Sequence, residues 1–260
     1  MSNLPEKQTN FDILQELTAA RLGLMRAGSS VATREVLKFD LDHARARDAV
    51  HLPFDTAAFE EELKKRELEF LSVQSAAKDR TTYLQRPDLG RKLSEGSRQQ
   101  LQDYATGNAI SADICIVIAD GLSSKAIDAN AINFLDEFLP LLPRNNWSLA
   151  PLVVAKQGRV ALADEVGEVL NVRLSIILIG ERPGLTAADS MGIYFTYEPK
   201  TGKTDADKNC ISNVREGGLS LKEAALKLEN LIQSSFKLCL SGVGLKDSDP
   251  LIIDKESDKG

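Results

Sequence analysis

One segment near the middle of the chain is apolar over its whole length. It follows Asp113 and reads Ile114-Cys115-Ile116-Val117-Ile118-Ala119. A strand with one face in water would alternate apolar and polar residues, whereas a continuous run is typical of a central parallel strand that is buried on both faces. This run therefore predicts a layered α/β fold with the segment at its centre.

The residues after this run alternate between strand-like and helix-like patterns. We expect strands at 149–155, 174–179 and 192–197, and helices at 123–142, at 163–170 and from Ser220 onward. Alternating strands and helices imply a doubly wound, mostly parallel sheet with right-handed crossovers. The predicted fold class is therefore α/β with a Rossmann-like sheet in residues 108–260.

The first hundred residues instead have helical spacing of apolar side chains, which predicts an all-helical N-terminal region over residues 1–107. Helices are expected at 11–27, closed by Gly28, at 33–50, from Asp55 onward and at 90–105. The third of these carries possible i,i+4 ion pairs such as Glu62 with Arg66, which favours a solvated face. The polar tail after Lys246 is expected to be loose.

Charge and composition exclude several classes of protein. The net charge is −6 and no basic run occurs, which argues against a nucleic-acid or anionic-membrane partner. Three widely spaced cysteines, Cys115, Cys210 and Cys239, imply no disulfide framework and fit a reducing compartment. The polar first ten residues carry no signal segment, and no apolar run is long enough to span a bilayer. The expected location is cytoplasmic.

Three short segments rich in glycine or small polar residues lie beside the predicted strands: 158–160, 180–184 and 209–213. Loops that leave the carboxyl ends of strands are where open α/β sheets bind ligands, so we expect these three to converge on one ligand. The turn Asp120-Gly121-Leu122-Ser123 opens a helix and could attract an anion, but an ordinary tight turn is the favoured interpretation.

The side chains in these segments suit binding better than catalysis. Glu181 can accept hydrogen bonds from amide donors, although a solvated surface turn is the alternative. Cys210 would need a neighbouring base to act as a nucleophile, and the two histidines, His43 and His51, lie in the helical part. A contact or packing role for Cys210 is preferred, and we expect no catalytic residue and no metal site.

Taken in order, these segments closely resemble the light (small) subunit family of ethanolamine ammonia-lyase. The match covers roughly residues 12–245. No single segment identifies the family, whereas the whole set of segments in this order does. They are Thr18-Ala19-Ala20-Arg21, Arg26-Ala27-Gly28, His43-Ala44-Arg45, Arg86-Pro87-Asp88-Leu89-Gly90-Arg91-Lys92-Leu93, Asp120-Gly121-Leu122-Ser123, Gly158-Arg159-Val160, Gly180-Glu181-Arg182-Pro183-Gly184-Leu185, Asp189-Ser190 and Cys210-Ile211-Ser212-Asn213.

The resemblance implies a function for the chain. Enzymes of this family use adenosylcobalamin to convert ethanolamine to acetaldehyde and ammonia, and their large subunit is a TIM barrel that carries the substrate site. The small subunit closes over the corrinoid at the subunit interface, in what the resemblance implies is a hexamer of heterodimers. Its corrinoid contacts correspond here to Val160, through the backbone carbonyl, to Glu181 and to Cys210.

Two further expectations follow from comparing the chain with this family. No DxHxxG motif is present, so the cofactor should keep its own dimethylbenzimidazole on cobalt, the base-on state. Many members carry a longer N-terminal extension that resembles a targeting segment for a bacterial microcompartment, whereas about ten residues precede the first expected helix here.

Two other functions compete with a corrinoid-clamping subunit. A stand-alone nucleotide-binding Rossmann-type enzyme would carry GxGxxG after its first strand, and Asp120-Gly121-Leu122-Ser123 does not match that motif. A pure assembly subunit without cofactor contact is the third interpretation.

Overall fold

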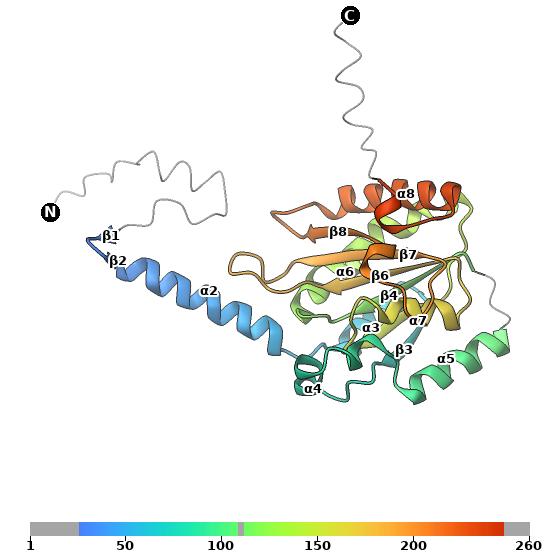
Figure 1. Ribbon diagram of the computed structural model, residues 1–260, viewed down its shortest axis with the longest axis horizontal. Helices are drawn as coiled ribbons and strands as arrows, with labels where there is room; N and C mark the ends of the chain where they lie inside the picture. The colour runs from blue at the N-terminus through green and yellow to red at the C-terminus, as the bar shows by residue number, and fades with distance from the viewer. Residues whose placement is uncertain (1–25, 109–111, 247–260) are drawn as a thin grey trace, which may run out of the picture.

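The computed structural model describes residues 26–108 and 112–246. Its centre is a six-stranded sheet, and one long helix, α2 (Thr33–His51), reaches away from it (Figure 1). The strands of this sheet are β3 (Phe70–Gln74), β4 (Ile114–Ala119), β5 (Leu152–Lys156), β6 (Leu174–Gly180), β7 (Met191–Tyr197) and β8 (Lys208–Val214). The other helices are α3 (Thr56–Lys65), α4 (Arg80–Gln85), α5 (Glu95–Asn108), α6 (Ser124–Phe138), α7 (Leu162–Val169) and α8 (Leu221–Leu238).

The strands lie in the order β3-β5-β4-β6-β7-β8. Neighbours from β3 to β6 are parallel, and β7 and β8 are added antiparallel at one side. The predicted α/β class with a mostly parallel sheet is confirmed. From β4 the chain passes through α6 to β5 on one side, and then through α7 to β6 on the other side of β4. The direction of winding therefore reverses at β4, and the gap between the carboxyl ends of β4 and β6 is where such sheets bind ligands.

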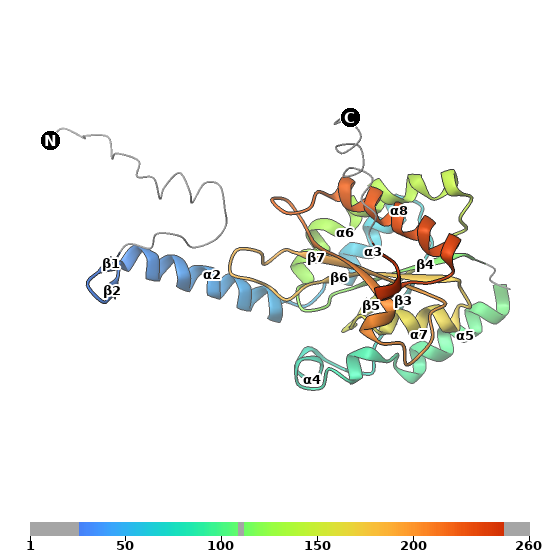
Figure 2. The ribbon, with the colours of Figure 1, turned by 45° about the horizontal axis from the view of Figure 1, so that its top comes forward.

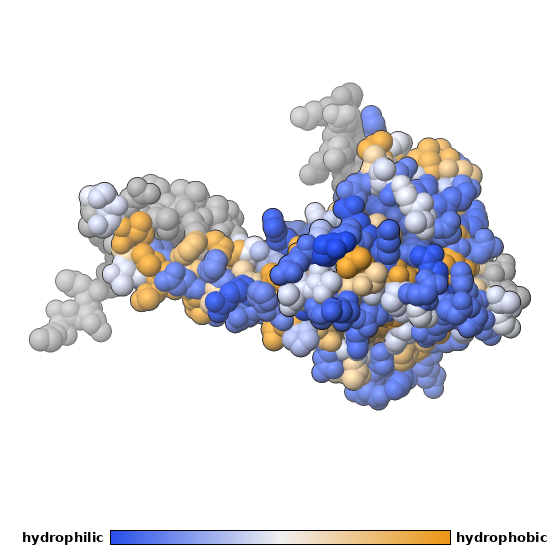
Figure 3. Space-filling view, turned by 60° about the horizontal axis from the view of Figure 1, so that its bottom comes forward, coloured by the Kyte–Doolittle hydropathy of each residue, from blue (hydrophilic) through white to orange (hydrophobic). Residues whose placement is uncertain are grey.

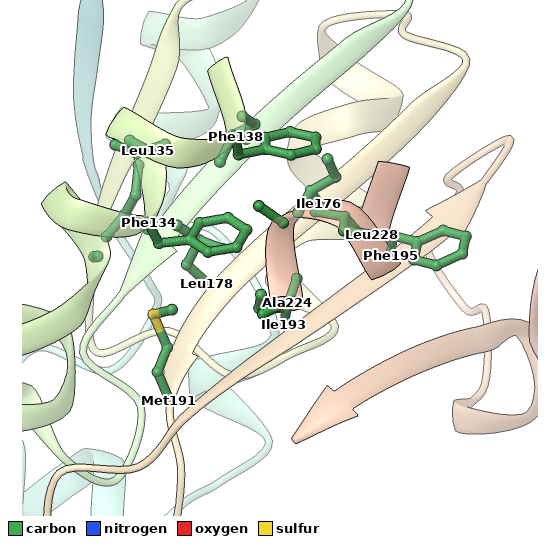
Figure 4. Close-up of a cluster of buried hydrophobic side chains, with 14 of the residues drawn as sticks. Phe134, Leu135, Phe138, Ile176, Leu178, Met191, Ile193, Phe195, Ala224 and Leu228 are labelled. Atoms are coloured by element: carbon green, nitrogen blue, oxygen red, sulfur yellow. The ribbon is translucent and has the colours of Figure 1, made fainter. Parts of the chain in front are cut away.

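Helices cover both faces of the sheet, as Figure 2 shows. Because successive side chains of a strand point to opposite faces, β4 sends Ile114, Ile116 and Ile118 into one core and Cys115, Val117 and Ala119 into the other. The first core contains α3, α6 and α8, and Figure 4 shows its centre, where phenylalanines of α6 meet β6, β7 and α8. The second core contains α5 and α7.

The caps of two helices agree with the sequence. The Ser123 hydroxyl accepts a hydrogen bond from Ala126 N at 3.2 Å and caps α6, and Ser220 with Glu223 forms a capping box on α8. Both helices bury residues spaced three and four apart, such as Ile127, Ala131 and Phe134 of α6. Truncation of one of these phenylalanines to alanine would cost about 3–5 kcal/mol.

Two glycines allow the ends of β4 and β6 to meet. Gly121 has a φ of +55°, and a Cβ placed on it would lie 2.2 Å from the carbonyl oxygen of Gly180. A Cβ on Gly180 would lie 2.0 Å from the carbonyl oxygen of Ser123. Leu122 N donates a hydrogen bond to that Gly180 oxygen at 2.9 Å, so the two loops leave their strands in direct contact.

The sequence predicted an all-helical N-terminal region, and the structure shows that this prediction is wrong. Phe70–Gln74 forms β3, which pairs with β5 at the edge of the sheet, and a short helix, α4, follows it. Arg26–Ala27 forms β1, which pairs with β2 (Ser30–Val31) across Gly28 at φ +64°, and so does not end a helix. The rest of the helix expected at 11–27 lies outside the described residues, as does the tail from 247 on.

Strand β8 is a second difference, because residues 209–213 were expected to form a ligand-binding loop. They lie instead within Lys208–Val214 and pair with β7. The sheet thus ends in an antiparallel β7–β8 pair, and Cys210 lies on strand β8 instead of in a loop. The division into regions 1–107 and 108–260 stays a prediction.

Helix α2 exposes apolar side chains as it leaves the body, and Figure 3 shows them as orange patches on the projecting arm. They include Val36, Leu37 and Leu41. Of the expected ion pairs on α3, Glu62–Arg66 forms at 2.9 Å, and the two lysines pair with glutamates three residues back. None of the helices in the described residues combines the length and apolarity needed to span a bilayer.

Candidate functional site

A cavity of about 140 Å³ lies at the carboxyl ends of β4, β5 and β6. Gly121 lines it after β4, Val160 after β5 and Glu181 after β6, with Tyr194 of β7 at its side. This is where the winding of the sheet reverses, the position at which open α/β sheets bind ligands. Two of the three predicted contact residues, Val160 and Glu181, therefore meet in one cavity.

Glu181 is held by the residues that begin β7 and end β8. Its backbone N–H donates to the Ser190 carbonyl at 3.0 Å, and the Ser190 hydroxyl donates to Glu181 Oε2 at 2.5 Å. The Asn213 backbone N–H donates to the same oxygen at 3.2 Å. Among the described residues nothing donates to Oε1, so this oxygen is available to a ligand that carries an N–H group.

Val160 lies in the loop that joins β5 to α7, and its side chain is half-buried. Its carbonyl oxygen accepts a hydrogen bond from Ala163 N at 3.3 Å as α7 begins. A carbonyl oxygen has two lone pairs, so one more donor can bind there. Gly158, two residues earlier, is fixed by its N–H donating to Asp120 Oδ1 at 3.2 Å.

Cys210 lies beside this cavity and is not part of its lining. It is directly opposite Tyr194 in the β7–β8 pair, and its thiol hydrogen-bonds with the Tyr194 side chain. Although the residue is exposed, partial burial of the thiol raises its pKa above the ordinary cysteine value, with the Tyr194 contact acting in the opposite direction. Burial raises the pKa of Tyr194 as well, followed by its hydrogen bond to Cys210. Tyr194 is therefore not a base that could activate the Cys210 thiol.

Tyr83 of α4 forms another wall of the cavity, and two arginines pack on its ring. The guanidinium carbons of Arg80 and Arg159 lie 4.8 Å and 4.2 Å from the ring centroid. The ring is fully buried, and its hydroxyl donates to the Gly158 carbonyl at 3.1 Å. Such cation–π contacts fix the orientation of the guanidinium groups.

Asp120 contacts residues of two segments that form the cavity, the β5–α7 loop and α4. Its carboxylate accepts from Gly158 N and lies 3.2 Å from the Arg80 guanidinium. Burial raises the pKa of Asp120 to about 6, an effect that the Arg80 charge partly opposes. The Asp120 turn, favoured above as an ordinary tight turn, thus builds the cavity wall through Gly121.

The site offers hydrogen-bond acceptors and fixed cations without a reacting pair. In residues 26–108 and 112–246 no cluster of three metal-ligating side chains occurs. His43 and His51 both lie on α2, and neither lines the cavity. The sequence analysis predicted no role at this site for Tyr83 or Tyr194. The one local signal for such a role is that each is an aromatic residue beside a segment already singled out. The arrangement can hold a polar ligand, and its described lining contains no nucleophile paired with a base.

Comparison with known proteins gives consistent matches over most of the chain. The family model for the ethanolamine ammonia-lyase light chain (EutC) matches residues 8–246. The chain is 51% identical to an ethanolamine ammonia-lyase small subunit of Azotobacter vinelandii over 243 residues, 94% of this chain and 90% of the relative. It is 51% identical to that of Pseudomonas fluorescens strain Pf0-1 over 234 residues, 90% of this chain and 85% of the relative. For Pseudomonas putida the identity is 50% over 244 residues, 94% of this chain and 90% of the relative.

Proposed function

This chain belongs to the ethanolamine ammonia-lyase light chain family, and from that premise we propose that it closes over adenosylcobalamin at an interface with the large subunit of the enzyme. The reaction is the conversion of ethanolamine to acetaldehyde and ammonia. The bound cofactor supplies the radical that starts this reaction. The chain itself binds and orients the corrinoid, and it contributes no reacting group.

The observation that carries the proposal is the meeting of Val160 and Glu181 in one cavity where the winding of the sheet reverses. The two residues are far apart in sequence and come from different strand ends. The hydrogen-bond acceptors of the site support a corrinoid ligand, because the side arms of the corrin ring end in amides, whose N–H groups need acceptors. Glu181 Oε1 and the Val160 carbonyl are two acceptors with room for a further donor.

Cys210 completes this set from the adjacent strand. Its thiol contacts Tyr194, which lines the cavity, so a ligand larger than the cavity would extend over the sheet edge onto Cys210. We assign it a contact role. The low acidity of the thiol fits this role, because a nucleophilic cysteine needs a lowered pKa or an adjacent base.

We further propose that the cofactor binds base-on, since His43 and His51 of this chain both lie on α2 and neither lines the cavity. The fold is interpreted as a Rossmann-like, doubly wound domain over residues 108–260, with residues 1–107 as the preceding region. The enzyme would be cytoplasmic and assembled with its large subunit, which carries the substrate site, as a hexamer of heterodimers.

A reconstitution assay tests the proposal. The purified chain alone should produce no acetaldehyde from ethanolamine, and addition of the large subunit with adenosylcobalamin should restore turnover. The large subunit with cofactor but without this chain is the matched control and should be inactive. Acetaldehyde formation by this chain alone would contradict the assignment of a non-catalytic role. The rival stand-alone nucleotide-binding enzyme would be supported by binding of a nicotinamide dinucleotide to this chain.

A further inference from the structure

A second, larger cavity adjoins the candidate site. It has a volume of about 620 Å³ and is bordered by the segment after α4, the start of α7 and the connection between β7 and β8. Arg159 and Val160 line both cavities. We call the larger one the basic basin because four cationic side chains line it, Arg91, Lys92, Arg159 and Lys203, against one carboxylate, Asp205.

The cations of the basic basin form no ion pair within the part of the chain that the structure describes. None of the four lies within 4 Å of a described carboxylate, whereas the cations elsewhere around α7 are paired, as in Lys208–Asp164 and Arg98–Glu165. Lys203 Nζ donates to the Tyr197 carbonyl at 3.0 Å, and the buried Nε of Arg159 has no hydrogen-bond partner. The chain as a whole carries a net charge of −6, so this concentration of unpaired positive charge does not follow from composition.

The backbone at the basic basin also favours an anion. Val160 and Ala161 line it immediately before α7, and among the described residues their backbone N–H groups donate no hydrogen bond. The N-terminus of a helix carries partial positive charge and presents such N–H groups to anions. Arginine adds a planar fork that matches the oxygens of a phosphate or carboxylate. Unpaired arginines and lysines together with free N–H groups are the usual composition of a phosphate site.

From these observations we infer that the basic basin binds a phosphate ester, and that in the assembled enzyme this is the phosphodiester in the nucleotide tail of the corrinoid. The second half of the inference rests on the proposed function. The side arms of the ring are neutral amides, so the phosphodiester is the one anionic group of the cofactor. Because Arg159 and Val160 belong to both cavities, one ligand can lie over the candidate site with its ring and place its tail in the basic basin.

Three corrinoids that differ in the tail isolate the phosphate. Cyanocobalamin carries the whole nucleotide tail, cobinamide lacks it, and cobinamide phosphate regains the phosphate without the base. The dissociation constant of each is measured by absorbance of the bound corrinoid in the complex of this chain with the large subunit. Arg91→Gln and Lys203→Gln are the test variants, since neither side chain is fully buried. Lys222→Gln, exposed on α8 over the other face of the sheet, is the matched control.

Each test variant should raise the dissociation constants of cyanocobalamin and cobinamide phosphate about tenfold, because a charge-assisted hydrogen bond is lost. Binding of cobinamide should stay as in the unsubstituted complex, and the control should change none of the three. Raised salt should weaken the two phosphate-bearing ligands more than cobinamide.

Four outcomes overturn part or all of this scheme. If the variants bind all three corrinoids normally while Glu181→Gln weakens all three, the basic basin is not the phosphate site and the proposed function stands. If Glu181→Gln also has no effect, the proposed function fails. Equal weakening of all three by the basin variants would mean that these charges do not act on the phosphate. A free-phosphate site would appear as calorimetric binding of inorganic phosphate that the variants abolish, with cyanocobalamin affinity unchanged, and this would reject the corrinoid assignment.

Discussion

The Ser190 hydroxyl donates a hydrogen bond of 2.5 Å to Oε2 of Glu181, and the backbone N–H of Glu181 donates to the Ser190 carbonyl at 3.0 Å. The two residues thus hold each other on either side of the loop between β6 and β7. With Oε2 engaged by Ser190 and by Asn213 N, the carboxylate is fixed so that Oε1 remains for a ligand. A carboxylate positioned in this way loses little conformational freedom when the ligand binds.

Replacement of Glu181 by glutamine should weaken cobalamin binding. The substitution removes a charged acceptor and leaves a buried ligand donor unpaired, at a cost of about 1–3 kcal/mol. We expect the dissociation constant of the complex for cobalamin to rise about ten- to a hundredfold, measured by equilibrium filtration with absorbance detection. Glu137→Gln, on the exposed side of α6, should leave it unchanged. Unaltered affinity of a folded Glu181→Gln complex would reduce Glu181 to a turn residue.

Ser190→Ala keeps the Glu181 carboxylate and removes the group that orients it. The expected effect is smaller, about a three- to tenfold rise in the same dissociation constant, because one hydrogen bond to a charged group is lost. In the double variant with Glu181→Gln the two effects should not add, since both act through the same carboxylate. Simple addition of the two free-energy changes would show that Ser190 acts elsewhere.

Cys210→Ala should weaken cofactor retention modestly and keep measurable turnover, because the thiol is a contact group without a base. Its raised pKa predicts slow alkylation by iodoacetamide at pH 7, with a rate that rises as pH climbs past the ordinary thiol range. Cys239, also exposed but at the end of α8, serves as the internal comparison when peptides are quantified by mass spectrometry. A loss of many orders of magnitude in turnover at saturating cofactor would instead indicate chemistry at Cys210.

The lower axial ligand of cobalt should be dimethylbenzimidazole. His43 and His51 lie on α2 and do not line the candidate site, so coordination by a histidine of this chain is not expected. Electron paramagnetic resonance of the cob(II)alamin state should show splitting from one base nitrogen, and labelling of protein histidines with nitrogen-15 should not alter it. A change in splitting on labelling would mean that a protein histidine has displaced the base.

The buried ion pair between Lys208 and Asp164 should be essential to stability as a pair. Lys208 Nζ and Asp164 Oδ2 lie 2.5 Å apart, with side chains 3% and 1% exposed. Lys208→Met leaves a buried carboxylate unpaired and should cost about 3–5 kcal/mol in urea unfolding. Lys208→Met with Asp164→Leu should recover most of that loss. Lys64→Met, which breaks an exposed pair on α3, is the control and should cost under about 1 kcal/mol.

Asp120 should make stability depend on pH between about 4 and 6. Its pKa is about 6 in the folded chain, above the ordinary 3.8, because burial disfavours the charged form. Its contribution to the free energy of unfolding is therefore full below pH 3.8 and is lost as pH rises through 6, by about 3 kcal/mol. Asp120→Asn should abolish this slope in the profile of the variant, so the difference between the two profiles should change by about 3 kcal/mol between pH 4 and 6, on top of a constant offset from unpaired Arg80. Parallel profiles would contradict a raised Asp120 pKa.

The sequence by itself determined the elements whose signals are local. The apolar run after Asp113 fixed β4 as a central strand, because six consecutive buried positions leave no face for water. Ser123 and Ser220 marked the starts of α6 and α8, since a cap depends on residues within one turn. The segments around Val160 and Glu181 were found because glycines mark close approaches of the backbone.

Only the tertiary structure decided how these segments meet. Phe70–Gln74 follows helical sequence and became β3 by pairing with β5, and Cys210 was placed on a strand by the pairing of β8 with β7. Strand pairing of this kind is set by partners distant in sequence and by packing against helices, α5 for β3 and α8 for β8, so short segments carry little local signal for it. Gly90 likewise reads as a turn residue, yet a Cβ there would lie 2.8 Å from Arg159 Cγ. Gly90 and Arg159 are far apart in sequence, so their contact is decided by how the segment after α4 packs against the β5–α7 loop. The same packing forms the wall between the candidate site and the basic basin.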